Sequence, residues 1–254
     1  MEKILFHQYG KNKNNMREQL IRVFTDTVSH IENGEYNKDL HCSKNRLSSI
    51  ELDSDIIKKP GIITVENLDC IEVASRLSKE GKTCMLNMAS YKKPGGGVKS
   101  GAMAQEEELA RRSNLMYGLP QEFYPLSIDE YIYTQDVTFF KNKYYQVIPS
   151  FDCDIITIAA INRSESTPAN YEEIMEEKIS NMLYIPYKNG CKNLVLSAFG
   201  CGVFKNDPHF VSELFKSLLD SGFSSLYSRV SFAILNDRNS VGSNYQIFKE
   251  TLLN

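Results

Sequence analysis

A glycine run and an acidic cluster lie close together near the middle of the chain. The glycines at 95–97 are followed, after the seven residues 98–104, by Gln105 and by glutamates at 106, 107 and 108. Glycine lets the main chain approach a ligand closely and turn its N–H groups toward a phosphate. Cleavage of a glycosidic bond can be carried out by two carboxylates, of which one fixes a sugar hydroxyl and the other exchanges a proton. The pattern indicates such chemistry beside a phosphate-binding loop.

The same glutamates also have a purely structural interpretation. Carboxylates in the first turn of a helix interact favourably with the helix dipole. Arg111 and Arg112 follow at the spacing of ordinary surface ion pairs. Residue types alone favour this interpretation, and we expect it to hold for Glu108, which would pair with the two arginines on the helix surface.

A second glycine-containing loop, SAFGCGVF at 197–204, follows another apolar run. Ligands of open α/β sheets bind at the carboxyl ends of strands, and two such loops on one edge would suit a pyrophosphate. Either loop is equally well explained as a tight strand-to-helix turn. Neither loop matches the GxGxxG or GxxxxGK[ST] fingerprint, which disfavours a Rossmann dehydrogenase or a kinase.

The elements that must position these loops follow from the spacing of apolar residues. Strands at 61–67 and 82–90 flank a helix at 68–81, and the glycine run leads into a helix at 105–119. This order predicts a mixed central sheet covered by helices on both faces. We expect one domain, 1–254, in which residues 1–60 form an N-terminal helical and loop extension. The remaining predictions are a helix at 16–33, a loop-rich connection at 35–60, strands at 130–142, 144–162, 191–200 and 229–236, and helices at 171–190 and 208–222.

Composition limits the class of protein. The 254 residues are 42% hydrophobic and 24% charged, and the net charge of -3 provides no basic field for binding nucleic acid. The six cysteines are scattered and the four histidines lack ligand spacing, so we expect reduced thiols, no metal and no cofactor. Since no stretch resembles a signal peptide or a membrane span, we expect a protein of the cytoplasm or nucleus with no membrane contact. We also expect the protein to be a monomer.

The segment PGGGVKSGAMAQEEELARRSNL resembles the signature of the poly(ADP-ribose) glycohydrolases, in which a triple glycine precedes Gln-Glu-Glu. Other segments are similar to successive blocks of the bacterial-type, or microbial, branch of that family: ITVENLDCIEVASRL, MLNMASYKKPGGG, YTQDVTFF, LVLSAFGCGVFKNDP and SFAILND. The likeness covers nearly the whole chain. It implies a macrodomain-like three-layer α/β/α sandwich that binds ADP-ribose.

The resemblance also implies roles for individual residues. Glu107 would be the catalytic acid/base, and Glu106 would hold ribose hydroxyls beside the scissile bond. Gln105 would shape the pocket, and Asn87 would contact the distal ribose or orient the glutamates. The diphosphate would lie between two loops, formed by Gly95, Gly96, Gly97 and Val98 on one side and by Gly200, Cys201, Gly202, Val203 and Phe204 on the other.

The function implied by this resemblance is hydrolysis of the ribose–ribose O-glycosidic bonds of poly(ADP-ribose), which releases ADP-ribose. Two alternatives stay open: a hydrolase that removes mono-ADP-ribose from an acceptor, and a non-catalytic reader of ADP-ribosylated proteins. The retained Gln-Glu-Glu argues against a pure reader, because binding a diphosphate requires no proton donor. Lys92 and Lys93, next to the glycine run, depart from the family pattern and put the preference for polymer length in doubt.

Overall fold

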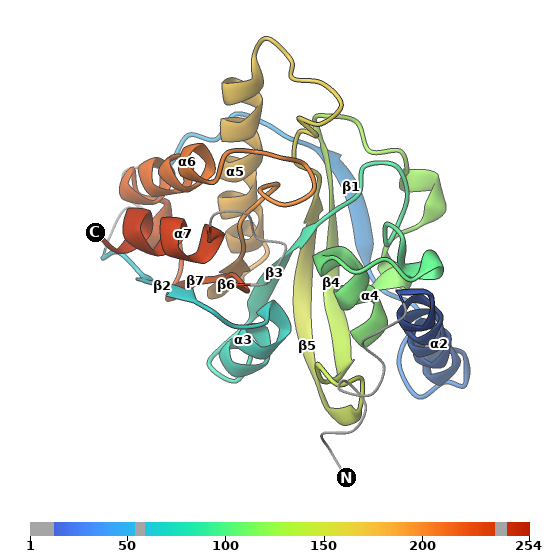
Figure 1. The fold of residues 1–254 in the computed structure, drawn as a ribbon. Coiled ribbons are helices and arrows are strands. Elements are labelled where there is room, and N and C mark those ends of the chain that lie inside the picture. The colour runs from blue at the N-terminus through green and yellow to red at the C-terminus, as the bar shows by residue number, and fades with distance from the viewer. Residues whose placement is uncertain (1–12, 54–58, 237–242) are drawn as a thin grey trace.

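The computed structural model describes residues 13–53, 59–236 and 243–254, and their centre is a seven-stranded sheet (Figure 1). The strand order is β1-β4-β5-β3-β6-β7-β2. Strands β5, β3, β6, β7 and β2 run parallel, whereas β4 pairs antiparallel with both β5 and β1. The predicted mixed sheet is therefore confirmed. The strands are β1 Cys42–Arg46, β2 Ile62–Glu66, β3 Thr83–Met88, β4 Glu130–Lys141, β5 Val147–Ile158, β6 Asn193–Leu196 and β7 Arg229–Ala233.

Helices cover both faces of this sheet, as predicted. Successive side chains of a strand point to opposite faces, so Leu86 joins one core cluster and its neighbour Met85 joins the other. The first cluster includes side chains of α5, α6 and α7, which Figure 1 shows grouped together, and the second includes side chains of α3 and α4. The result is a three-layer α/β/α sandwich. The helices are α2 Lys13–Glu32, α3 Cys70–Leu77, α4 Gln105–Arg112, α5 Tyr171–Lys188, α6 Pro208–Asp220 and α7 Asn244–Leu253.

The N-terminal helix α2 packs beside the glycine loop and α4. Phe24 of α2 forms a small apolar cluster with Val98 and Ala110. A Cβ at Gly101 would lie 2.5 Å from the carbonyl oxygen of Arg17, so α2 approaches this loop backbone to backbone. The predicted helical extension is thus attached directly to the segment that carries the acidic cluster.

Three elements differ from the sequence-based expectation. Residues 42–46, expected in a loop-rich connection, form β1 at the sheet edge, where backbone pairing with β4 needs no apolar pattern. Helix α7 was not predicted. The helix expected at 105–119 ends at Arg112, because the Ser113 hydroxyl donates to Leu109 O (2.7 Å) and accepts from Leu115 N–H (3.1 Å) in place of the helical pattern.

Candidate active site

A cleft of about 1190 Å³ opens beside the carboxyl ends of the central strands. Strands β3 and β6 are parallel neighbours, so the loops that follow them leave from the same edge of the sheet. This confirms the expected placement of the two glycine-containing loops. The cleft is lined by seven of the predicted site residues, Gln105, Glu106, Glu107, Gly200, Gly202, Val203 and Phe204.

Two adjacent glutamates lie at the N-terminus of α4, and both are buried. Glu107 accepts two backbone hydrogen bonds, from Gly97 N–H to Oε1 (2.8 Å) and from Ala104 N–H to Oε2 (2.9 Å). Glu106 accepts one from Ser90 N–H to Oε2 (2.7 Å), while its Oε1 is buried without a partner. The neighbouring carboxylates therefore have different environments.

The pKa of the Glu106 carboxyl is raised to about 8. The principal cause is burial, which disfavours the charged form, and the nearby Glu107 carboxylate adds to the rise. The Ser90 N–H, the Asn87 side chain and the Gly95 backbone favour the charged form and so lower the pKa of Glu106, without cancelling the rise. The raised pKa therefore lies at Glu106, the first glutamate of Gln105-Glu106-Glu107.

The glycine run brings the main chain against both carboxylates. Gly96 has φ +54, in the left-handed region that favours glycine. A Cβ at Gly96 would lie 2.5 Å from Glu107 Oε1 and 2.9 Å from Glu106 Oε2. The close approach that the sequence indicated is therefore an approach to the protein's own glutamates.

The two glycine loops differ in their free N–H groups. In the first loop, Gly97 N–H donates to Glu107, and Val98 N–H donates to Gly95 O (3.0 Å). In the second loop, the N–H groups of Gly202, Val203 and Phe204 donate to no atom of the described chain. Free N–H groups in such a loop form an anion-binding nest. The second loop, rather than the first, combines N–H groups that have no acceptor in the described chain with residues that line the cleft.

The other predicted residues take distinct positions. Gln105 links α4 to β3, since its Oε1 accepts from Met88 N–H (2.9 Å) and its Nε2 donates to Leu86 O (2.5 Å). Asn87 lies on β3 and is fully buried. The cleft lining does not include Asn87, Gly95, Gly96, Gly97, Val98 or Cys201.

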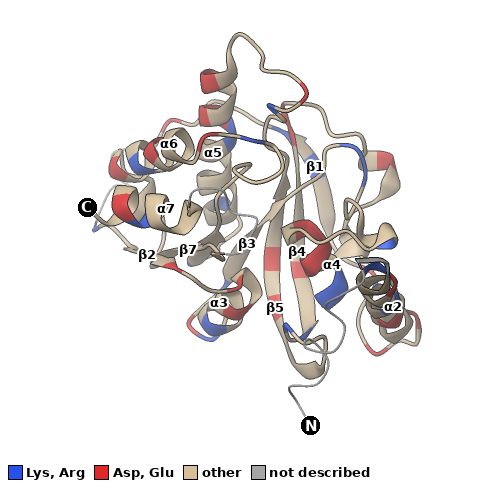
Figure 2. Cartoon of the chain, in the orientation of Figure 1, with Lys and Arg blue, Asp and Glu red and all other residues tan. Residues whose placement is uncertain are grey.

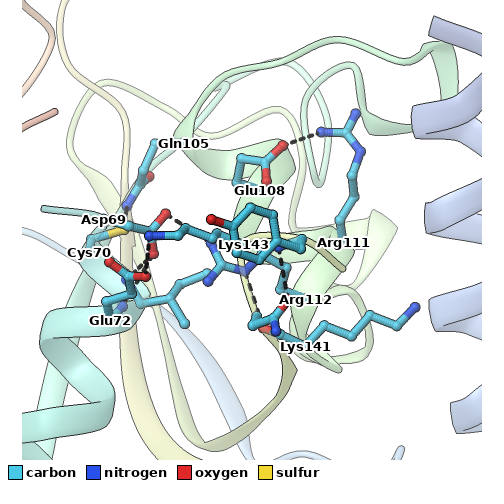
Figure 3. Close-up of polar contacts among 12 residues, drawn as sticks. Asp69, Cys70, Glu72, Gln105, Glu108, Arg111, Arg112, Lys141 and Lys143 are labelled. Atoms are coloured by element: carbon cyan, nitrogen blue, oxygen red, sulfur yellow. Dashed lines mark hydrogen bonds and ion pairs between the residues drawn. The ribbon is translucent and has the colours of Figure 1, made fainter. Parts of the chain in front are cut away.

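The two arginines of α4 are not surface residues, which corrects the sequence-based expectation. Arg111 and Arg112 are 0% and 1% exposed. Arg111 Nη1 pairs with Glu108 (2.9 Å), and Arg112 Nη1 pairs with Asp69 (2.8 Å), as Figure 3 shows. Figure 2 shows the acidic first turn and basic last turn of α4. Glu108 therefore does pair with an arginine, but that arginine anchors α4 in the protein interior.

Several residues near the site were missed by sequence reasoning. Ser90 donates to Glu106 only because its loop folds back over α4. The Tyr145 hydroxyl donates to Glu108 from the β4–β5 hairpin (2.9 Å). Thr157 of β5 accepts a hydrogen bond from Asn87 Nδ2 (3.2 Å). Each contact joins segments far apart in the chain, so no local pattern signals it.

The described residues contain no group of three or more His, Cys, Asp or Glu side chains that could hold a metal ion. Within the same ranges, no helix combines the length and apolar character needed to cross a membrane.

Comparisons with known proteins identify related chains. The model of the microbial-type PARG catalytic domain matches residues 2–142, more than half of the chain. The structure of poly(ADP-ribose) glycohydrolase (PARG) from Thermomonospora curvata is similar with a TM-score of 0.80 and 26% identity, covering 92% of this chain and 100% of that one. The same enzyme bound to the inhibitor ADP-HPD gives a TM-score of 0.78 at 26% identity, covering 92% and 99%.

A second related structure is PARG from Deinococcus radiodurans in complex with ADP-ribose. Its TM-score is 0.69 at 26% identity, and the match covers 94% of this chain and 92% of that one. No curated protein sequence matches significantly. Since the family model spans more than half of the chain and the structural matches extend over nearly all of it, the chain belongs to the microbial-type PARG family of glycoside hydrolases.

Proposed function

We propose that the protein hydrolyses the ribose–ribose O-glycosidic bonds of poly(ADP-ribose) and releases ADP-ribose. The observation that carries this proposal is the pair of buried adjacent carboxylates, Glu106 and Glu107, in a cleft beside a loop with free N–H groups. Such a site combines a proton-exchanging group with a place for a diphosphate. Family membership and the ADP-ribose complex of the Deinococcus enzyme support the same substrate class.

The chemistry requires two tasks of the carboxylates. Cleavage of the bond between two riboses builds positive charge at the anomeric carbon, while the leaving hydroxyl oxygen needs a proton. Glu107 acts as the general acid, protonates that oxygen and then activates water as the general base. Glu106 holds the ribose hydroxyls and stabilises the transition state. The assignment of Glu107 rests on its place as the second glutamate of Gln-Glu-Glu.

The loops place the substrate against these carboxylates. The free N–H groups of Gly202, Val203 and Phe204 bind the diphosphate. The Phe204 ring, which lines the cleft and packs against the core, supports the adenosine. The loop at 95–98 and Cys201 complete the walls through their backbone, because the Val98 side chain is buried in the core. Gln105 and Asn87 hold the glutamates.

The test is release of free ADP-ribose from poly(ADP-ribosyl)ated protein, with mono-ADP-ribosylated proteins assayed in parallel. We expect release from the polymer by the parent protein, a loss in Glu107→Gln of at least about 100-fold, and retained ADP-ribose binding by calorimetry. Glu122→Gln is the control, because Glu122 is an exposed glutamate outside the cleft. Release from mono-ADP-ribosylated protein alone would support the acceptor hydrolase instead. Binding without any release would identify a reader.

A folding measurement must accompany the Glu107→Gln assay. Both Glu107 oxygens accept backbone N–H groups, so the amide nitrogen of glutamine would face a donor at Gly97 or Ala104. An unsatisfied buried pair of this kind costs about 1–3 kcal/mol. Calorimetric binding of ADP-ribose by the variant separates loss of chemistry from loss of structure.

A further inference from the structure

The cleft is larger than a single small ligand requires. Pockets that hold one small molecule or cofactor occupy about 300–1,000 Å³, whereas this cleft occupies about 1190 Å³. Its lining continues from the loop with free N–H groups past Glu106 and Glu107 to helix α2 and the β4–β5 hairpin. We call this continuation the hairpin arm and define it by its lining residues Met16, Leu20, Met103, Lys143 and Tyr144.

The hairpin arm begins directly beside Glu107. Met103 precedes Ala104, whose N–H donates to Glu107 Oε2 (2.9 Å). The Met103 side chain is 61% exposed, and it lines the cleft together with Glu107. A group that is bonded to the substrate at the atom protonated by Glu107 therefore lies next to the hairpin arm.

One buried guanidinium joins the walls of the hairpin arm. Arg111 Nη2 donates to Ala102 O, and Arg111 Nε donates to Leu20 O (3.3 Å). Arg111 Nη1 pairs with Glu108 Oε1 (2.9 Å), and the Tyr145 hydroxyl donates to the same oxygen (2.9 Å). The segment before α4, helix α2 and the hairpin therefore meet around one ion pair. Walls that are held together in this way need little ordering when a ligand binds.

Exposed apolar side chains gather in the cleft. Of the nine large apolar side chains that are exposed among the described residues, five line it. Such a concentration of exposed apolar surface marks a ligand site. Two of the five lie in the hairpin arm, at a distance along the chain from the loop that follows β6. The five are Leu68, Met103, Tyr144, Val203 and Leu235.

The charges at this end of the cleft are balanced. Each of its lining carboxylates, apart from Glu106 and Glu107, is paired with a lysine or an arginine. A neutral apolar wall favours an uncharged planar group, such as a nucleobase, over a phosphate. The pairs are Asp69–Arg112 (2.8 Å), Glu72–Lys143 (3.0 Å) and Glu108–Arg111 (2.9 Å), and Figure 3 labels their residues.

The Tyr144 ring is held in place and is accessible. The Tyr144 N–H donates to Asn142 Oδ1 (2.8 Å), which fixes the turn of the hairpin. The Lys143 ammonium lies 5.7 Å from the centre of the ring. Tyr144 is nevertheless 56% exposed, which leaves ring surface open to a ligand. Nucleobases stack on aromatic side chains of this kind, because every base has a flat π-face.

We propose, on the basis of the hydrolase function above, that the hairpin arm binds the adenine of the leaving nucleotide of poly(ADP-ribose), with Tyr144 as the residue on which it stacks. In this polymer the leaving ribose itself carries an adenine. Its hydroxyl oxygen receives the proton at Glu107, so the attached adenine reaches the arm that begins at Met103. A single ADP-ribose on a protein side chain has no second adenine. The hairpin arm therefore selects the polymer.

The direct test is a calorimetric comparison of two ligands, ADP-ribose and an ADP-ribose dimer in which sulfur replaces the bridging oxygen, so that the bond between the riboses resists hydrolysis. Stacking of the second adenine should make the dimer bind about 10-fold more tightly. Tyr144→Ala should remove this difference, whereas Tyr144→Phe, which keeps the ring, should preserve it. Equal affinities of the parent for both ligands, or a difference that survives Tyr144→Ala, would overturn the proposal.

Val147→Ala is the matched control. Val147 is an exposed apolar residue at the start of β5, close to Tyr144 in the chain but outside the cleft. The preference for the dimer should persist in this variant. Its loss would show that the shape of the hairpin, and not the Tyr144 ring, produces the preference, and the assignment of Tyr144 would then be wrong.

Binding of the dimer requires no catalysis, so the two proposals fail separately. A protein that prefers the dimer but releases no ADP-ribose from the polymer would refute the proposed function and retain the adenine site. In the release assay, Tyr144→Ala should lower kcat/KM on poly(ADP-ribose) by about 10-fold and have no such effect on mono-ADP-ribosylated protein. The reverse pattern would identify the hairpin arm as a polypeptide site and contradict the proposal.

Discussion

At the scale of single residues, Glu106 and Glu107 show how one helix turn gives two adjacent carboxyls different properties. Glu107 has both oxygens held by N–H groups of the glycine loop and the helix start. Glu106 lies deeper, with one oxygen unpartnered, and burial raises its pKa. The difference follows from position rather than residue type, since the side chains are identical. Gly96 matters to both because its missing side chain leaves room for their carboxylates.

Substitution of Gly96 by alanine tests this close approach. The positive φ of +54 costs an alanine about 1 kcal/mol, and the new Cβ would displace both carboxylates. A displacement of about 1 Å at a reacting group can cost about 100-fold in rate, so we expect at least that loss of kcat/KM on poly(ADP-ribose). Gly34→Ala is the control, because Gly34 has φ +81 and nothing within 4 Å of its Cβ position. Equal activity of both variants would contradict the role of Gly96.

At the scale of elements, helix α4 is positioned by its C-terminal arginines as well as by its acidic N-terminus. Arg112 joins α4 to the start of α3 through Asp69, whose Oδ1 also caps α3 by accepting from Ile71 N–H (3.0 Å). Arg112 Nε donates to Lys141 O at the end of β4 (3.2 Å). One buried guanidinium therefore fixes α4 relative to a helix and a strand. The glutamates that project from α4 depend on this arrangement.

Replacement of Arg112 by methionine should be strongly destabilising. Breaking a buried ion pair by removing one partner costs about 3–5 kcal/mol, because the charge that remains is left without its counter-charge. Lys143→Met is the matched control: Lys143 pairs with Glu72 (3.0 Å) in an exposed site, where the loss should be at most about 1 kcal/mol. Denaturant unfolding of the two variants measures the difference. Similar losses in both would show that α4 is not anchored through Arg112.

At the scale of the whole molecule, the chain is organised around one sheet with a core on each face. The sheet carries both cores, and alternate residues of a strand such as Leu86 and Met85 belong to different ones. Residues 42–46 pair with the sheet edge, and α2 packs against the glycine loop and α4. The N-terminal region is thus joined to the rest by backbone pairing and by apolar contact. We propose that residues 1–254 fold as one domain.

This organisation predicts a single cooperative unfolding transition. Because the two cores share the same strands, loss of either one should remove the support of the other. Differential scanning calorimetry should give a van't Hoff enthalpy equal to the calorimetric enthalpy. Two resolved transitions, or separate unfolding of the first 60 residues, would show that the N-terminal region is an independent unit.

The sequence determined much of the fold because the signals involved are local. Apolar alternation and helical spacing predicted the sheet strands from β2 to β7, the helices α2 to α6 and the glycine loops at one sheet edge. Strand β1 and helix α7 escaped prediction. The residues CSKNR carry no apolar alternation, and their extended conformation comes from pairing with β4. The sequence-based end of α4 was wrong because the Ser113 side chain competes with the backbone.

The same distinction between local signals and contacts of distant segments applies to the candidate active site. By itself, the sequence determined that a glycine run and Gln-Glu-Glu lie within one strand–loop–helix segment, because these are local features. Only the tertiary structure decided that the first loop holds the glutamates while the second offers free N–H groups, that Glu106 is the carboxyl with the raised pKa, and that the arginines are buried. Burial and charge environment depend on segments distant in the chain, such as α2, Ser90 and the β4–β5 hairpin, which no local pattern can report.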